Sequence, residues 1–293
     1  MTAHPIAFTL SYSGALADDQ EIDLYDVGQA LIGFQRSLAL TTHLILNNKI
    51  ITQAPSLKGA RVIALPPEDG SWRFTAAIVS LVGGVYALGT APKDTPVGHL
   101  IRSAYDYVVS ETLGFHVDYD KTLGQQYEEL KKRNPDIQSL PQWRFDSLTE
   151  KCEAAIKDMH RPIVWSKTAT KAEIISRVGS DEHPFEHPLD QETFEYIHVT
   201  QMSETAFEFV GRVSSYNINT FKGRLYIEDE RRPIPFELAP SARDVRGIAC
   251  VTESLSANAQ TRFRDDGNIR IVAFPSTSKS GRLKSLLIVK ASR

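Results

Sequence analysis

The stretch RFTAAIVSLVGGVYALGTAPK, residues 73–93, has the greatest bearing on the fold of this 293-residue chain. Its nineteen uncharged residues, 74–92, lie between Arg73 and Lys93. As an α-helix with a rise of ~1.5 Å per residue, they would extend roughly 28 Å, close to the ~30 Å of a bilayer core. The stretch therefore predicts an apolar helix over 74–92.

Two interpretations of this predicted helix stay open. Ala76, Ser80 and Gly84 recur at every fourth position, a spacing that lets membrane helices pack closely, so they are candidate membrane or oligomer interface residues. Against a membrane span, the stretch is rich in glycine and its first residues continue the hairpin that precedes it. A helix shortened in this way to about fifteen residues is more typical of a buried core.

The chain around this stretch indicates a mixed strand–helix domain over residues 1–180. Alternating apolar residues predict a strand at 6–12, and an apolar stripe predicts a helix at 23–48. Two β-rich runs flank the turn sequence PPEDG and predict a hairpin over 59–79. Further helices are predicted from Pro96 to Gly114, within 118–136, within 140–162 and, as a short one, within 166–179.

The C-terminal part changes to a β pattern. Residues 181–192 combine prolines and acids with few apolar residues, which predicts a linker. Strands are predicted at 194–201, 206–216, 223–229, 232–238, 268–274 and 282–291, with one helix within 242–260. The predicted fold class is α+β, with a helical hairpin in the N-terminal domain and a small, β-rich, barrel-like domain over 193–293.

Charge and cysteine content narrow the functional classes. The net charge is −3, but residues 194–293 hold 15 Lys and Arg against 11 Asp and Glu, which is +4 and leaves −7 on the rest. A basic C-terminal third favours an anionic ligand or partner there. The only cysteines, Cys152 and Cys250, suggest no disulfide framework or metal site. The expected location is intracellular, either cytoplasmic or associated with the inner membrane.

No catalytic motif stands out in the sequence. His183 and His187 have the spacing of a zinc-binding helix, but Pro184 and Pro188 prevent such a helix. There is no nucleophile elbow, no phosphate-binding glycine loop and no dinucleotide fingerprint. We therefore predict no cofactor and no metal, and lean towards a protein that is not an enzyme.

Two basic segments of the C-terminal domain are candidate binding sites. The segment 274–284 is a predicted hairpin turn that could cradle an anion. Its candidate ligand-binding residues are Ser276, Thr277, Ser278, Lys279, Arg282 and Lys284. The second segment, 221–236, mixes basic residues with aromatic ones, as nucleic-acid-binding barrels do, although acids at 228–230 dilute its charge.

The runs LYDVGQALIGFQRSLALTTHLI, GARVIALPPEDGSWRF and SGRLKSLLIVKA together resemble a group of uncharacterised bacterial two-domain proteins associated with antiphage-defence loci. The resemblance covers most of the chain. It implies a defence setting and assigns no catalytic or binding residue.

These observations support three functional hypotheses. The first is a non-enzymatic oligomeric sensor–effector in antiviral or stress defence, whose C-terminal domain binds an anionic ligand and whose apolar helix engages the membrane. The second is a soluble scaffold or adaptor that uses that helix as core or oligomer interface. The third is a nucleic-acid-binding protein. The expected partners are a second copy of the chain, a protein of the same defence system and a nucleotide or nucleic acid.

Overall fold

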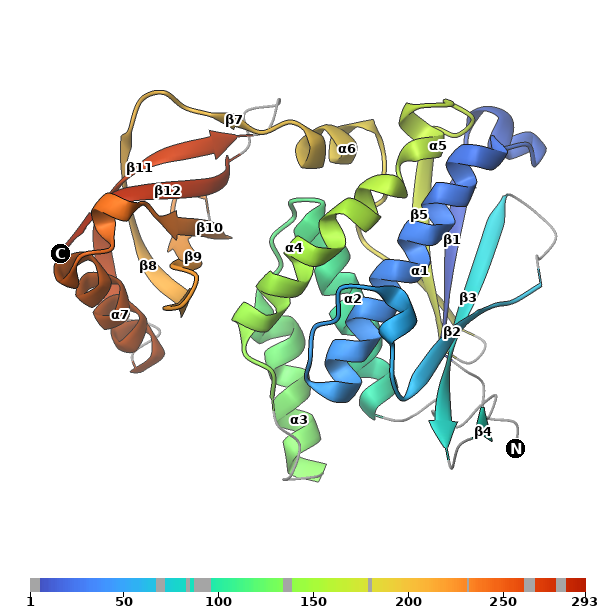
Figure 1. The fold of residues 1–293 in the computed structure, drawn as a ribbon, viewed down its shortest axis with the longest axis horizontal. Coiled ribbons are helices and arrows are strands. Elements are labelled where there is room, and N and C mark those ends of the chain that lie inside the picture. The colour runs from blue at the N-terminus through green and yellow to red at the C-terminus, as the bar shows by residue number, and fades with distance from the viewer. Residues whose placement is uncertain are drawn as a thin grey trace. The chain divides into compact units, whose positions relative to one another are not determined.

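The computed structural model describes residues 6–66, 72–82, 85–86, 96–133, 139–178, 181–230, 232–260, 267–277 and 283–293. The chain forms two compact units. The first holds most of residues 1–197, and the second holds residues 198–293 (Figure 1).

The first unit is built on an antiparallel sheet with the strand order β2-β3-β1-β5-β6, in which β4 adds to β3. Its strands are β1 Ile6–Ser13, β2 Ala60–Ala64, β3 Arg73–Val82, β4 Val85–Tyr86, β5 Lys171–Val178 and β6 Asp181–Pro184. The central strand β1 pairs with β3 on one side and with β5 on the other. It is buried along nearly its whole length.

The helices of the first unit lie on one side of this sheet (Figure 1), and aromatic side chains lie between α2 and the sheet. They are α1 Leu24–Asn47, α2 Pro96–Thr112, α3 Gln125–Arg133, α4 Gln142–Asp158, α5 Arg161–Val164 and α6 Gln191–His198. Phe8 of β1 meets Tyr105 of α2 edge-on at 5.2 Å between ring centroids, and Phe185 at 6.3 Å. The predicted helices at 23–48, from Pro96, within 118–136 and within 140–162 are all confirmed.

The predicted helix over 74–92 is wrong where the structure describes it, because residues 73–82 form strand β3. This strand lies between β2 and β1, and residues 75–79 are buried. A central strand covered on both faces reads as a continuous apolar run, which periodicity alone does not distinguish from a buried helix. The predicted hairpin of 59–79 is confirmed by the antiparallel pairing of β2 with β3.

The interface residues proposed for that helix therefore do not form a helical line. Ala76 is buried in β3 between Phe8 and Ala64, and Ser80 lies opposite Ala60. Gly84 lies outside the described residues. Within the part of the chain that the structure describes, no helix is both long enough and apolar enough to cross a membrane.

Three further predictions near the unit boundary are corrected. Residues 171–178 form strand β5 instead of a short helix, and 191–198 form helix α6 instead of a strand. The predicted linker 181–192 contains β6 and the start of α6, and the division between the units falls at His198. The carboxylate of Asp190 accepts the N–H of Thr193 at 2.8 Å, so the acids and prolines begin a helix here and do not mark a linker.

The second unit is a closed five-stranded barrel. Its strands are β8 Phe207–Asn217, β9 Lys222–Ile227, β10 Arg232–Leu238, β11 Asn268–Thr277 and β12 Leu283–Ser292. They pair in the ring β8-β9-β10-β12-β11-β8, and β7 Gln201–Met202 extends β11. Every pair is antiparallel except β10 with β12, which is parallel. The predicted α+β class with a C-terminal β-barrel is thereby confirmed.

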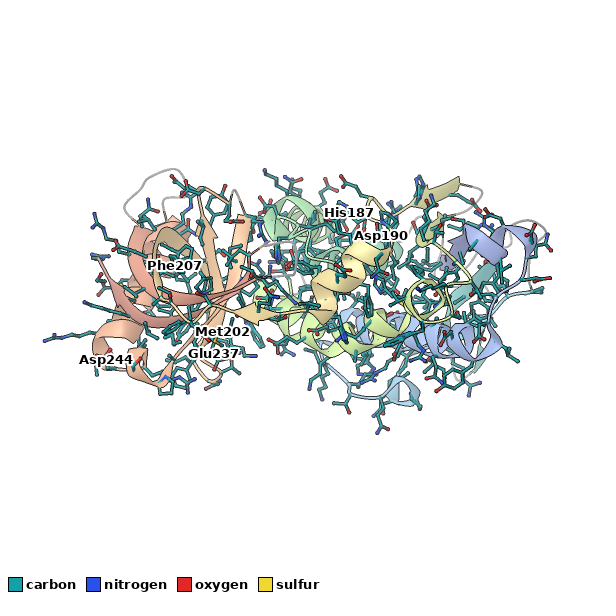
Figure 2. The ribbon with its side chains drawn as sticks, turned by 90° about the horizontal axis from the view of Figure 1, so that it is seen from above. His187, Asp190, Met202, Phe207, Glu237 and Asp244 are labelled. Atoms are coloured by element: carbon teal, nitrogen blue, oxygen red, sulfur yellow. The ribbon has the colours of Figure 1, made fainter. Side chains whose placement is uncertain are left out.

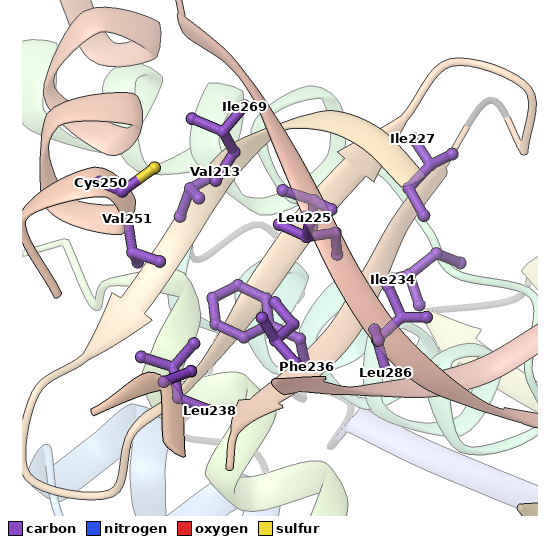
Figure 3. Packing of buried hydrophobic residues seen from close by; sticks show 14 of the residues in the cluster. Val213, Leu225, Ile227, Ile234, Phe236, Leu238, Cys250, Val251, Ile269 and Leu286 are labelled. Carbon is purple, nitrogen blue, oxygen red and sulfur yellow. The ribbon is translucent and has the colours of Figure 1, made fainter. Parts of the chain in front are cut away.

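Side chains that alternate along these strands fill the barrel (Figure 3). Helix α7 Val245–Gln260, which begins after the N-cap Asp244, adds Cys250 and Val251 to the same core. In the barrel's own numbering the ring runs 1-2-3-5-4-1, with the helix between strands three and four. This is the connectivity of the oligonucleotide/oligosaccharide-binding (OB) barrel, a five-stranded Greek key.

Candidate nucleic-acid interface

The outer face of the barrel over β8, β9 and β10 carries the strongest candidate site. Along β9, Leu225 and Ile227 point into the core, so the strand alternation places Lys222, Arg224 and Tyr226 on the opposite side. Lys222 is exposed and Tyr226 is half-buried, whereas Arg224 is buried. In an OB barrel, this face of the second and third strands is the usual binding surface for oligonucleotides and oligosaccharides.

A stacked pair, Arg212 on Tyr226, lies at the centre of this face. Arg212 of β8 lies directly opposite Tyr226 of β9, which in turn lies opposite Pro233 of β10. The Arg212 guanidinium carbon is 4.7 Å from the centre of the Tyr226 ring. Its Nη1 also lies 3.8 Å from the carboxylate of Glu228. The pair presents a planar cation stacked on an aromatic ring, a combination that suits a nucleobase and its phosphate.

Two prolines open the barrel wall beside this pair. Pro233 and Pro235 have no N–H, so their nitrogens cannot take part in the β9–β10 ladder and must face towards β12. Accordingly, β12 pairs with β10 only at residues 236–238. The guanidinium of Arg232 spans the open part, because its Nη2 donates to the Leu283 carbonyl at 2.8 Å.

A second arginine–aromatic pair lies at the other end of the same strands. The Arg243 guanidinium carbon is 4.5 Å from the centre of the Phe221 ring, and its Nη2 donates to the Glu237 carboxylate at 3.0 Å. Glu237 lies on β10 opposite Lys222. Phe221 has a φ of 57°, a conformation that only a fixed turn imposes on an aromatic residue. This pair is therefore held in place by the turn between β8 and β9.

Inside the barrel, the ring of Tyr216 stacks on that of Phe236 at 6.2 Å. Burial raises the pKa of Tyr216, so the phenol stays neutral at physiological pH. Gly223 lies opposite Tyr216, and a Cβ there would lie 2.7 Å from the Phe236 ring. The core thus requires glycine at this position of β9, next to Lys222.

The predicted site at 276–284 forms the connection between β11 and β12, the fourth and fifth strands of the barrel. Ser276 is buried on β11, and Thr277 ends that strand half-buried. The Lys284 ammonium donates to the Thr200 hydroxyl at 2.6 Å. Ser278, Lys279 and Arg282 lie outside the described residues. The structure thus places three of the six residues, and binding at this loop stays a prediction.

The predicted basic segment 221–236 contributes two accessible residues to the candidate face, Lys222 and Tyr226, whereas Arg224 on the same side of β9 is buried. Arg232 instead pairs with Glu230 through Nε at 3.1 Å and Nη2 at 2.9 Å. The partner residues Arg212 and Arg243 were missed, because only the pairing of β8 with β9 and the position of the helix start bring them to Tyr226 and Phe221.

The histidine pair of the sequence has a structural role in the first unit. His183 lies on β6, and the ring of His187 stacks on Phe115 with 3.5 Å between centroids (Figure 2). Among the described residues, no three His, Cys, Asp or Glu side chains converge as a metal site requires.

Two family models match the chain. One, described as a domain of unknown function (DUF7946), matches residues 8–198, and the other, described as a family of unknown function (DUF7947), matches residues 205–292. The interval between the matches falls where the chain divides into its two units. No curated protein and no solved structure matches the chain.

Proposed function

The chain belongs to the DUF7946 family, whose description names no activity, and we propose from the barrel that it is a binding protein for single-stranded nucleic acid. The observation that carries the proposal is the Arg212–Tyr226 pair, which joins the outer faces of the first and second strands of an OB-type barrel. A base stacks on Tyr226, and Arg212 pairs with the adjoining phosphate.

The electrostatics of the second unit support the same ligand. Residues 194–293 carry a net charge of +4, whereas the remaining 193 residues carry −7. The basic connection between β11 and β12 corresponds to the loop between the fourth and fifth strands, which joins the binding face in OB barrels. Phosphate contacts from Lys279 and Arg282 would fix the strand while aromatic stacking tolerates any base.

In this proposal the protein is the sensing, non-catalytic component of a bacterial defence system, the setting that the sequence resemblance implies. The first unit transmits the occupied state of the barrel to a partner. Membrane engagement is not part of the proposal, because its basis was a helix at 74–92 and residues 73–82 form a strand.

Fluorescence anisotropy of a labelled 20-nucleotide single strand with the full chain tests the proposal. We expect binding that is stronger for the single strand than for the matching duplex. Tyr226→Ala should weaken it about tenfold, because stacking contributes ~1–3 kcal/mol per base. Tyr226→Phe, which keeps the ring, should bind like the wild-type chain.

Charge variants distinguish specific phosphate contacts from non-specific electrostatic attraction to the whole domain. Lys279→Ala with Arg282→Ala should reduce the slope of log affinity against log salt by about 1.4, roughly 0.7 for each phosphate contact on a single strand. Arg246→Ala removes a charge from the exposed side of α7 and serves as the control. No binding in ~50 mM salt, or equal losses in the Tyr226, loop and Arg246 variants, would refute the proposal.

A further inference from the structure

Five large apolar side chains are exposed around the first half of α1, in the unit that holds none of the proposed nucleic-acid contacts. Leu24 and Tyr25 are 84% and 67% exposed, Ile32 and Trp165 are each 59% exposed, and Leu16 is 48% exposed. We call these five residues the α1–α5 patch. Apolar side chains that gather on a surface in this way are typical of an interaction site.

Backbone and side-chain contacts hold the parts of the patch together. The N–H of Ala17, next to Leu16, donates to the Thr168 carbonyl at 2.8 Å. The guanidinium carbon of Arg161, on α5, lies 5.3 Å from the centre of the Tyr25 ring. Figure 1 shows α5 beside the N-terminal end of α1. The three chain segments that carry the patch are therefore neighbours.

A buried carboxylate fixes the geometry of the patch. Asp26, in the first turn of α1, accepts from Arg161 Nε at 3.0 Å and from the Ser166 N–H at 3.0 Å. Trp165 precedes Ser166 and meets Phe194 edge-on at 6.4 Å between centroids. The exposed rings are thus held by residues that are themselves anchored, which lowers the entropy cost of binding a partner.

The surface along α1 also leaves room for a close neighbour. Leu24, Gly28 and Ile32 follow at every fourth position and share one helix face. A Cβ built on Gly28 would have no atom within 4 Å, so this position is open. Leu24 and Ile32 therefore lie on one helix face, with only Gly28 between them.

The rim of the patch is acidic. Asp18, Asp19, Glu21 and Asp23 are all exposed on the segment that joins Leu16 to Leu24. Two nearby cationic side chains are already paired: Arg161 with Asp26 at 2.9 Å and Lys171 with Glu173 at 2.8 Å. Lys167 is exposed. An apolar surface with this rim complements a cationic partner and disfavours an anionic one.

We propose that the α1–α5 patch is a docking site for a cationic segment of a protein partner. An apolar side chain of the partner packs on Leu24 and Tyr25, beside Trp165. Lysine or arginine side chains of the same segment pair with the carboxylates of Asp19 and Glu21. This site is separate from the proposed nucleic-acid site and does not depend on it.

Synthetic peptides supply the probe. A labelled 16-residue peptide of leucine and lysine, arranged as an amphipathic helix, is titrated with the full chain. One comparison peptide replaces lysine with glutamate, and another replaces leucine with serine. We expect both to bind at least about tenfold more weakly than the leucine–lysine peptide, because the site needs charge and an apolar anchor together.

Variants of the chain locate the binding. Leu24→Ser with Tyr25→Ala should weaken the leucine–lysine peptide at least about tenfold, as truncation of interface anchors does. Val245→Ser removes an apolar side chain that is 86% exposed on α7 and should change nothing. Asp19→Lys with Glu21→Lys should weaken binding by a similar factor, whereas the equal charge change Glu128→Lys with Glu129→Lys on α3 should not.

Equal affinities of wild-type and both patch variants for the leucine–lysine peptide would overturn the proposal. So would equal binding of the serine–lysine peptide, which would show attraction by charge alone. Binding that the nucleic-acid single strand displaces, and that the patch variants leave unchanged, would place the peptide on the barrel and equally overturn it.

Discussion

The side chain of His160 is fully buried in the first unit, between α4 and α6. Its Nδ1 lies 2.9 Å from the Ile156 carbonyl and therefore donates to it, which leaves Nε2 to accept from the Thr193 hydroxyl at 3.0 Å. In the neutral imidazole both contacts are satisfied, with Nδ1 as the donor and Nε2 as the acceptor. Burial accordingly lowers the pKa of His160 to about 4.

This shift predicts a loss of stability in mild acid. An unfolded histidine has a pKa of about 6.5, so between pH 6.5 and 4 the unfolded state binds more protons than the folded one. The free energy of unfolding should therefore fall as the pH drops through this window, by about 2 kcal/mol at pH 5. Urea unfolding at pH 7.5 and at pH 5.0 measures the difference.

The variant His160→Asn isolates the effect, because an amide does not titrate in this range. It should be less stable at pH 7.5, yet lose about 2 kcal/mol less than the wild-type chain on going to pH 5. An equal pH dependence in the two proteins would assign the acid sensitivity to other groups.

At the same scale, the sequence identified part of the candidate interface. Lys222, Arg224 and Tyr226 were visible as a basic and aromatic run on a predicted strand. Arg212 was not, because it precedes Tyr226 by fourteen residues and meets it only through the β8–β9 register. Side chains that converge through pairing leave no local pattern in a single sequence.

At the scale of the element, two glycines of helix α1, Gly28 and Gly33, have different surroundings. Gly33 faces α4, where a Cβ would lie 2.2 Å from the Ala155 carbonyl oxygen. Gly28 faces outwards, with no atom within 4 Å of its Cβ position. Both glycines lower the intrinsic helix propensity of α1, and the structure shows that Gly33 permits close packing of α1 against α4.

The same substitution at these two positions should therefore have opposite effects. Gly33→Ala should lower the free energy of unfolding by about 1–3 kcal/mol, because the backbone of α4 must move. Gly28→Ala should raise it by about 0.5–1 kcal/mol through helix propensity. Thermal and urea unfolding of the two variants decide the matter, and destabilisation of equal size at both positions would contradict this packing.

Elements with a periodic apolar pattern, such as α1 and β1, were predicted well, whereas β3 was not. Helix α1 carries a clear stripe and an Asp23 cap and β1 alternates, whereas β3 presents apolar residues in succession. The position of a strand inside a sheet determines whether both its faces are covered. That position depends on partners far along the chain, so β3 was taken for a helix.

On the scale of the whole molecule, the barrel has its own hydrophobic core and its own buried hydrogen bonds between α7 and the strands. The Ser254 hydroxyl, on α7, donates to the Gly267 carbonyl at 2.6 Å and accepts the Val213 N–H at 2.9 Å. Ser254→Ala leaves a buried N–H without this acceptor and should cost the barrel about 1–3 kcal/mol.

In a Trp143→Phe background, tryptophan fluorescence distinguishes the two units, because the remaining Trp72 and Trp165 both lie in the first unit. In Ser254→Ala, the unfolding transition seen by circular dichroism should begin at lower urea, while the fluorescence transition should stay in place. Equal shifts of both signals would mean that the units unfold together.

The division into an α+β unit and a small barrel was predicted from composition and pattern, but the closure of the barrel was not. The parallel β10–β12 pair joins strands separated by α7 and β11, and no local sequence pattern predicts such a pairing. That pair completes the ring on which the nucleic-acid proposal depends.

Cross-linking of the full chain to a photoreactive single-stranded oligonucleotide, followed by mass spectrometry, is the most direct test of that proposal. The account predicts cross-linked peptides from residues 222–238 and from the 276–284 connection, and their loss in Tyr226→Ala. Cross-links confined to residues 6–198, or their absence at low salt, would contradict it.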